Sequence, residues 1–291
     1  MASGFFALFD DIATLMDDVA AMSKIATKKT AGILGDDLAV NAEKATGFVS
    51  SRELPVIWAI TKGSFLNKLI ILPLIIGLSA FAPWAVVPVL MIGGLYLGYE
   101  GAEKIYEYFF PHPQNKVEID DHKVLSETEI IALEKKKIKS AIVTDFILSL
   151  EIVIIALSTV ADKTMPVRIM VLIAIAILAT IGVYGIVALI VRLDDMGFAI
   201  MRKGEKYNKK FLEKFGYFMV QALPYVIKIL AIVGTLAMLL VAGGIFVHNI
   251  HQIHEWFSFL PNLLLEFLVG LLIGFLVLGV VKLVIFIKNR F

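Results

Sequence analysis

The segment from Ile169 to Val191 constrains the fold of this chain more than any other part of the sequence. It contains no charged residue and lies directly between Arg168 and Arg192. A helix needs about 20 apolar residues to cross the hydrocarbon core of a bilayer, which is about 30 Å thick. The segment meets this requirement, and we expect it to form a transmembrane helix.

The composition of the whole chain extends this expectation. Of its 291 residues, 59% are hydrophobic and 18% are charged, whereas soluble domains are about 45–50% apolar and about 25% charged. The chain has no cysteine, and 27 basic against 26 acidic residues give a net charge of +1. These figures exclude a disulfide-rich scaffold and a basic surface for nucleic acid. A multi-pass membrane protein is the class that remains.

Four other regions are apolar enough to supply further spans. Leu69–Tyr99 is uncharged, but Ala82-Pro83-Trp84 interrupts it and indicates a helical hairpin with a tight turn. Ile229–His254 also lacks Asp, Glu, Lys and Arg, while Ala141–Ala161 and Trp256–Val281 carry isolated acidic residues. We therefore predict an all-α fold of about six transmembrane helices.

Lysine and arginine residues predict which segments face the cytoplasm, because they are enriched on that side of a membrane protein. Five occur in residues 1–53, seven in 100–140 and seven in 192–214, whereas the turn at 82–83 and residues 250–255 have none. This alternation along six spans places both termini in the cytoplasm. The expected parts are a cytoplasmic amphipathic segment 1–53, a membrane hairpin 54–104, a cytoplasmic connector 105–140, and a four-helix membrane region 141–291 with a cytoplasmic loop 192–214.

Residues 5–26 repeat apolar side chains at helical spacing, with acidic residues on the opposite face, and predict an amphipathic helix. Paired aspartates in this helix and in the segment 192–214 form an expected cytoplasmic acidic cluster, and Asp36 and Asp37 are a further pair. Carboxylate oxygens suit Mg²⁺, Mn²⁺ or Ca²⁺, and solvated helix starts and turns are the alternative explanation. The residues of the cluster are Asp10, Asp11, Asp17, Asp18, Asp194 and Asp195.

Similar short motifs in the two halves of the sequence suggest a degenerate internal duplication. Leu54-Pro55 and Leu223-Pro224 are each followed by a lysine, and Gly93-Gly94 resembles Gly243-Gly244 in the same order along the two halves. Transporters are often built from such repeats. Chance similarity between apolar helices is the alternative.

Ionisable residues inside the expected spans are the main functional candidates, because each costs about 2.5–3.5 kcal/mol at the centre of a membrane helix unless it is paired or hydrated. Glu151 lies near the middle of its span, and Asp145 and Ser149 lie one turn apart on one face of the same helix. Lys228 and Glu266 lie in the last two spans. These residues could line a path for a cation or proton. The alternatives are a structural Glu–Lys pair that joins helices and a position of these residues closer to the membrane surface.

Three of the five histidines, His248, His251 and His254, occur close together and are followed by Glu255. Imidazole and carboxylate groups are ordinary ligands of zinc and similar ions, and a histidine-rich turn at the membrane interface is the alternative. No Gly-x-Ser-x-Gly, His-Glu-x-x-His or phosphate-loop motif occurs, and without cysteine there is no thiol nucleophile. We expect neither an enzyme nor a cofactor, apart from a divalent cation.

Several long motifs are distributed over nearly the whole chain. They are 5–20, 28–39, Arg52–Pro55, Lys62–Lys68, Ser79–Trp84, Tyr99–Lys104, Thr144–Ser149, Val183–Gly185 and Leu193–Gly197. In these motifs the chain closely resembles the YedI-like family of bacterial inner-membrane proteins. The resemblance implies a Gram-negative inner membrane, and it implies no mechanism, because the family is a domain of unknown function.

A shorter likeness concerns the third expected span. Asp145-x-x-x-Ser149-x-Glu151 is faintly similar to the acidic, serine-containing helices of tellurium-resistance-type metal exporters. Those proteins usually have Asp at the position of Glu151. The likeness extends over a few residues and favours a cation as the solute.

The sequence therefore supports two functional hypotheses of different kinds. The first is an inner-membrane transporter or channel for an ion or small solute, with a divalent cation as one candidate. The second is a non-transporting structural or assembly protein whose charges join helices. The expected partners are the lipid bilayer and, in the first hypothesis, the solute. A homo-oligomer is compatible with both hypotheses, and no nucleic acid is expected.

Overall fold

The structure, a computed structural model of the chain, describes residues 2–46, 50–110, 127–257 and 259–288. These residues form helices and turns and contain no strand. In chain order the elements are α1 (Ala2–Ala45), α2 (Ser50–Phe81), η1 (Pro83–Ala85), α3 (Val86–Phe109), α4 (Glu127–Thr159), α5 (Met165–Val191), α6 (Leu193–Lys206), α7 (Lys210–Asn249), α8 (His251–Trp256) and α9 (Asn262–Lys288).

Six of these helices, α2, α3, α4, α5, α7 and α9, are long and apolar enough to cross a membrane. This number agrees with the prediction, and the break between α2 and α3 falls at Pro83, which begins the short η1 turn. Proline lacks a backbone N–H and restricts the residue before it, so a helix ends there. The all-α prediction is confirmed, and the six apolar helices indicate a multi-pass membrane protein.

Several helices extend past the ends of their apolar segments. α2 begins at Ser50 and α7 at Lys210, each roughly five turns before the predicted start of the span. α9 begins only at Asn262, after the short α8. Hydrophobicity marks the part of a helix suited to the bilayer core, whereas the helix itself ends where its backbone hydrogen bonds end. Lys68 therefore lies well inside α2.

The segment 192–214, predicted as a loop, is mostly helical. It contains α6, which packs against the first part of α7. A Cβ added to Gly216 of α7 would lie 2.5 Å from the carbonyl oxygen of Gly197 in α6. The two glycines therefore allow the backbones to meet, as small residues do at close helix contacts.

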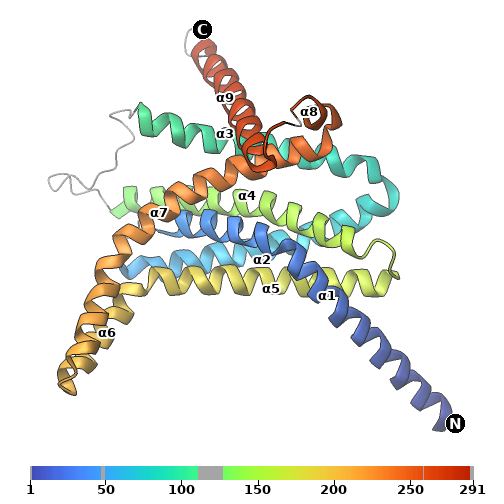
Figure 1. Cartoon of the computed structure of the whole chain (residues 1–291), viewed down its shortest axis with the longest axis horizontal. Helices are drawn as coiled ribbons and strands as arrows, with labels where there is room; N and C mark the ends of the chain where they lie inside the picture. Colours follow the sequence, from blue (N-terminus) through green and yellow to red (C-terminus); the bar gives the residue numbers. More distant parts are fainter. Residues whose placement is uncertain (1, 47–49, 111–126, 258, 289–291) are drawn as a thin grey trace.

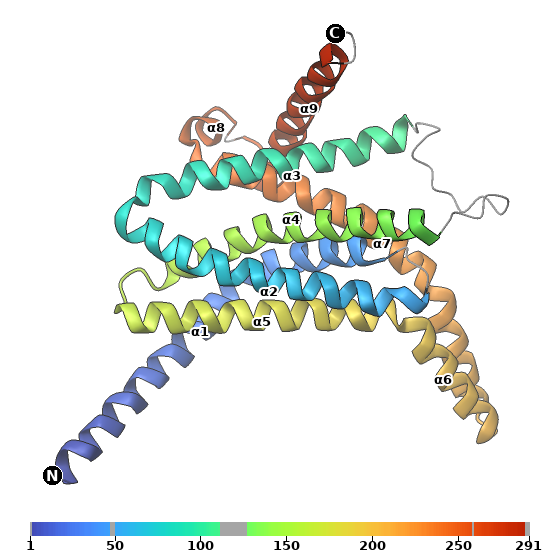
Figure 2. The same ribbon diagram turned by 180° about the vertical axis from the view of Figure 1, so that it is seen from behind.

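The helices form two groups (Figures 1 and 2). α2, α4, α5 and the second half of α1 run side by side, and α3, α7 and α9 form the second group. The groups contact each other mainly through α1 and α7. Buried apolar side chains from both groups share the larger of two core clusters, which includes Val40, Leu148, Leu172 and Met238.

The first half of α1 extends away from the bundle at the end that carries the α2–α3 turn and the α4–α5 loop, whereas α6 lies at the opposite end (Figures 1 and 2). The structure therefore does not bring the predicted acidic cluster together. The sequence also predicts that the N-terminus and segment 192–214 lie on the same side of the membrane. In the structure they lie at opposite ends of the bundle, so the two predictions are not both compatible with it. The separated residues are Asp10, Asp11, Asp17 and Asp18 on α1 and Asp194 and Asp195 on α6.

The second half of α1 lies inside the bundle, although α1 is not one of the six apolar helices. Ala26 and Val40 are fully buried, and the helix contacts α4, α5 and α7. Small residues permit this packing, since a Cβ added to Gly234 of α7 would lie 3.1 Å from the carbonyl oxygen of Ala39. The predicted amphipathic helix 5–26 is thus the first half of a longer helix.

Glycines also determine how α9 meets α3 and α7. A Cβ added to Gly270 would lie 1.9 Å from the carbonyl oxygen of Leu239, and one added to Gly98 would lie 3.4 Å from the Cα atom of Gly274. The helices therefore meet backbone to backbone. Gly279, further along α9, has no atom within 4 Å of the place its Cβ would occupy.

We expect Gly270→Ala to separate α7 from α9 and to lower stability by about 1–3 kcal/mol, the usual cost of overpacking. The measurement is thermal unfolding of the purified protein in detergent. Gly279→Ala is the matched control, because it adds the same methyl group to the same helix in open space. Its melting temperature should be unchanged or slightly raised, and equal melting temperatures for both variants would contradict this packing.

Candidate functional site

A buried polar stripe on α2 forms the first part of the site. Ser64, Asn67 and Lys68 are spaced so that they share one face of the helix, and all three are buried. A polar group that is buried without partners loses its hydrogen bonds to water. The partners of this stripe come from α4 and α5.

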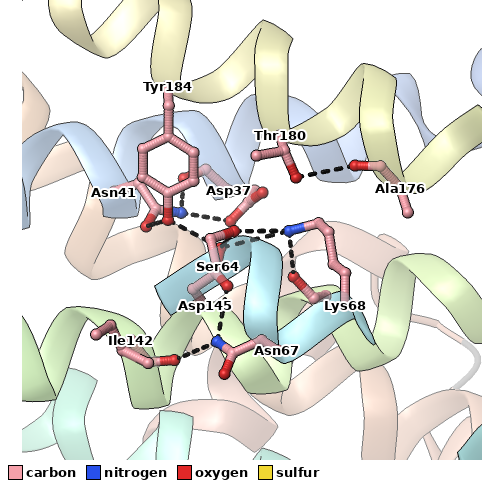
Figure 3. A network of polar contacts seen from close by, with 11 residues as sticks. Asp37, Asn41, Ser64, Asn67, Lys68, Ile142, Asp145, Ala176, Thr180 and Tyr184 are labelled. Carbon is pink, nitrogen blue, oxygen red and sulfur yellow. Dashed lines mark hydrogen bonds and ion pairs between the residues drawn. The ribbon is translucent and has the colours of Figure 1, made fainter. Parts of the chain in front are cut away.

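Asp145 of α4 lies at the centre of the site (Figure 3). Its Oδ1 accepts a hydrogen bond from the Ser64 hydroxyl at 2.8 Å and lies 2.9 Å from the Tyr184 hydroxyl, and its Oδ2 accepts one from the Asn67 amide at 2.9 Å. The side chain is completely buried. Both carboxylate oxygens therefore have donors, which come from α2 and α5.

Lys68 is the positive charge of the site. Its Nζ lies 3.7 Å from Asp145 Oδ1 and donates hydrogen bonds to the hydroxyls of Ser64 and Ser149 at 2.8 and 2.9 Å. Two of the three N–H groups of the ammonium therefore have hydroxyl acceptors, and the Asp145 carboxylate lies at ion-pair distance. Lys68 and Asp145 thus form a buried ion pair in which both side chains also have polar partners, and such partners help to offset the cost of burying the charges.

A second carboxylate, Asp37 of α1, lies in the same place (Figure 3). Asn41 donates to Asp37 Oδ1 at 2.5 Å, and the Asn41 carbonyl oxygen lies 3.0 Å from the Tyr184 hydroxyl. The single hydroxyl proton of Tyr184 can serve either Asn41 or Asp145, so α5 links α1 to α4. Within the described part of the chain, Asn41 is the only side chain that donates to the Asp37 carboxylate.

The charges of this central network, Asp37, Asp145 and Lys68 with their polar neighbours, do not balance. Two carboxylates, 1% and 0% exposed, face one ammonium group. Burial, followed by repulsion from Asp145, raises the pKa of Asp37 to about 7, and Lys68 opposes this less strongly. Near neutral pH, Asp37 is therefore the carboxyl group suited to hold a proton or accompany a cation.

A second polar group adjoins the network at the end of α1. Lys44 donates to the hydroxyls of Ser140 and Thr144 at 2.8 and 2.7 Å and forms an ion pair with Glu100 of α3. Thr144 directly precedes Asp145 in α4, so the two groups are neighbours. This group borders a cavity of about 200 Å³, whose lining residues are Glu43, Lys44, Thr46, Glu100, Lys104, Lys137 and Ser140.

An acidic region, Asp36, Glu151 and Glu266, lies beyond the network along α4. Oε2 of Glu151 is buried and has no hydrogen-bond partner among the residues that the structure describes. Electrostatic repulsion acts on Glu151 from Asp36, Asp37 and Glu266. Burial and the Glu266 carboxylate also raise the pKa of Asp36. Carboxyl groups from α1, α4 and α9 thus lie near one another, and Glu266 also contacts His248 of α7.

The structure separates the five residues predicted to line a path. Asp145 and Ser149 belong to the central network, and Glu151 and Glu266 belong to the acidic region. Lys228 lies on the exposed face of α7 and is a member of neither. Instead of a Glu–Lys pair with Lys228, the structure joins α2 to α4 through the buried pair Lys68–Asp145 and α1 to α3 through Lys44–Glu100.

The predicted histidine site gains no support from the described residues. These contain no group of three or more His, Asp or Glu side chains arranged to hold a metal ion. Nδ1 of His248 lies 2.7 Å from the carbonyl oxygen of Gly244, and the side chains of His251 and His254 lie outside the described part. A bound divalent cation stays a prediction.

Reasoning from the sequence does not find Asp37, Asn41, Asn67 or Lys68. It assigns Asp37 to a pair that a solvated turn explains, and Lys68 directly precedes the uncharged segment. Polar rather than apolar periodicity could have found them, because Ser64, Asn67 and Lys68 recur at i, i+3 and i+4, and Asp37 and Asn41 at i and i+4.

The motifs behind the family resemblance contain most of the network. Residues 28–39 include Asp37, Lys62–Lys68 includes the stripe of α2, Thr144–Ser149 includes Asp145, and Val183–Gly185 includes Tyr184. These four motifs are far apart in the sequence. The structure brings them together at one place (Figure 3).

The fold and the network define a class of protein, a bundle of apolar helices with an ion pair and an additional carboxylate buried at its centre. The chain belongs to the family described as Protein of unknown function (DUF808), whose model matches residues 3–280. This match fits the YedI-like resemblance without itself carrying that name. Comparison with curated proteins and with solved structures gives no match.

We expect Lys68→Met to destabilise the protein by about 3–5 kcal/mol, because it leaves Asp145 buried without a counterion. Combining it with Asp145→Asn removes both charges and should recover most of the loss. Thermal unfolding in detergent measures both effects. Lys62→Met is the matched control, since Lys62 is exposed on the same helix. Equal stability of Lys68→Met and Lys62→Met would show that the ion pair does not hold the bundle together.

Proposed function

We propose that this protein moves cations or protons across a membrane through the polar groups inside its helix bundle. The observation that carries the proposal is the excess of buried carboxylates in the central network, where Asp37 and Asp145 face one basic side chain among the described residues, Lys68. The proposal keeps the transport function expected from the sequence. It narrows the solute to a positively charged species.

The charge imbalance supports a site for one positive charge. A charged side chain at the centre of a membrane helix costs about 2.5–3.5 kcal/mol unless it is paired or hydrated. Lys68 offsets one of the two carboxylates. The other is neutralised only when it holds a proton or accompanies a cation. Burial and repulsion from Asp145 raise the pKa of Asp37, which favours a proton or a cation at this site.

The polar groups form a series along α4, which supports a path. Ser140 and Thr144 contact the Lys44 group beside the cavity, Asp145 belongs to the central network, and Glu151 belongs to the acidic region. A transported ion needs such a sequence of polar contacts in an otherwise apolar bundle. Transporters also commonly bind their solutes near the middle of the membrane.

The alternative is that these charges only join helices. Arg52 and Glu134 form a pair of this kind, with two hydrogen bonds of 2.6 and 2.7 Å in which each charge has its counterion. Asp37 and Glu151 differ from it, because no described basic side chain forms a salt bridge with either. Unmatched acids favour transport over a purely structural role.

We also propose a bacterial inner membrane as the location, which the family resemblance implies. The basic segment 192–214 supports a cytoplasmic position for the end of the bundle that carries α6. Lipid is the proposed partner of the apolar side chains exposed on α9, such as Leu272 and Leu276. A second copy of the chain is the other candidate for this face.

Reconstitution of the purified protein into liposomes tests the proposal. Entrapped dyes that respond to protons, Na⁺, K⁺ or Mg²⁺ report influx down an imposed gradient. We expect influx of at least one of these ions above that of protein-free liposomes. Asp37→Asn should lose most of it, because the variant removes the unmatched carboxylate. Asp162→Asn alters an exposed residue of the α4–α5 loop and is the matched control.

Two outcomes would change this conclusion. If folded wild-type protein leaves the liposomes as impermeable to all four ions as protein-free liposomes, cation transport is wrong and the structural alternative gains support. If influx occurs and is the same in Asp37→Asn and Asp162→Asn, the protein transports ions without using the central network.

A further inference from the structure

Glu266 of α9 lies directly against the backbone of α7. A Cβ added to Gly243 would lie 1.7 Å from the Glu266 carbonyl oxygen, and one added to Gly244 would lie 3.9 Å from Glu266 Oε2. The absence of side chains at these two glycines lets the carboxyl group approach α7. It lies there beside His248, one turn after Gly244.

The hydrogen bond between the His248 ring and the backbone of α7 shows which ring nitrogen carries a hydrogen. Nδ1 lies 2.7 Å from the Gly244 carbonyl oxygen, and since a carbonyl oxygen only accepts, Nδ1 carries a hydrogen. In the neutral ring, Nε2 is then an acceptor, and it lies 3.7 Å from Glu266 Oε1. A lone pair that faces a carboxylate is repelled. A proton on Nε2 or on Glu266 makes the contact attractive.

The charges around this pair also favour a proton. Asp36 of α1 and Glu151 of α4 both interact electrostatically with Glu266. The short helix α8 carries the exposed Glu255, a few residues after the end of α7. The contacts of α3 with α7 and α9 are made at glycines, which bring no charge. These neighbouring charges are acidic, and they attract a positively charged ligand to the pair.

Glu151 supplies a second acceptor deeper in the bundle. Its Oε2 is buried, and no described residue gives it a hydrogen bond. His248, with 67% of its side chain exposed, and Glu266, with 18% exposed, lie closer to the surface. The three residues thus lead from an exposed imidazole to a buried oxygen without a partner.

We propose that Glu266 and His248 bind one exchangeable proton and that Glu151 receives this proton on the way to the central network. A proton suits the pair because Nε2 of His248 and Oε1 of Glu266 face each other at 3.7 Å, and either atom can carry it. The role of the pair in ion movement rests on the proposed function. The binding of the proton by the pair does not.

Dicyclohexylcarbodiimide detects the proton on Glu266 directly. A protonated carboxyl group adds to this apolar carbodiimide, its proton moving to one nitrogen and its oxygen bonding to the central carbon. The adduct rearranges to a stable N-acylurea without losing an atom, and an ionised carboxylate does not add in this way. The full chain in liposomes is labelled at several pH values and digested, and mass spectrometry identifies the modified residue.

We expect label on Glu266 at acidic pH and its loss at alkaline pH. In His248→Gln the imidazolium that stabilises the ionised carboxylate is missing, so the label should persist to more alkaline pH than in the wild type. Glu266→Gln should lose the label, and Glu205→Gln, at an exposed position of α6, is the matched control. An unlabelled Glu266 at every pH, or the same pH profile without His248, would overturn the proposal.

Proton influx into the same liposomes separates this proposal from the transport function. We expect Glu151→Gln to keep the label on Glu266 and to lose proton influx. Labelling of Glu266 as expected, with no influx of any ion in the wild type, would support the proton site and contradict transport. Normal proton influx in Glu266→Gln would overturn the role of the pair while leaving transport intact.

Discussion

The ion pair between Lys68 and Asp145 is the interaction on which the rest of the structure depends. Removing two charges from water costs several kcal/mol each, and only close pairing with complete hydrogen bonding offsets this. Asp145 has donors on both of its oxygens, and Lys68 donates to two serine hydroxyls and lies 3.7 Å from Asp145. The pair leaves Asp37 as an unmatched carboxylate beside it. The proposed function follows from that third charge.

The polar network also explains why α1 lies inside the bundle. This helix is not apolar enough to be counted among the spans, and hydrophobic burial alone would not favour its position. Asp37 and Asn41 meet Tyr184 and the ion pair, and Lys44 meets Glu100 on α3 and hydroxyl groups on α4. A helix with polar side chains is stable there because the surrounding helices offer it partners. Structure and candidate function thus depend on the same contacts.

Much of the fold could be predicted from the sequence, because membrane spans obey a local rule. About 20 apolar residues mark a span, and Pro83 marks the break of the hairpin. Asp145 and Glu151 could be identified because a charge in such a span is conspicuous, and Ser149 because it lies one turn from Asp145 on the same helix face. Polar periodicity could have placed Asp37 and Lys68 on polar helix faces, but their contacts could not be predicted, since their partners lie on other helices. Such contacts depend on how the helices pack, which local periodicity does not specify.

Cryo-electron microscopy of the protein in lipid nanodiscs tests the central claim most directly, because it can show whether a water molecule or a cation lies beside the unmatched buried acids. We predict density for water or a bound ion beside the Asp37 carboxylate, next to the Lys68–Asp145 pair, and beside Oε2 of Glu151. A Glu151 side chain that faces lipid, together with an Asp37 carboxylate surrounded only by protein atoms, would contradict an ion path through this bundle.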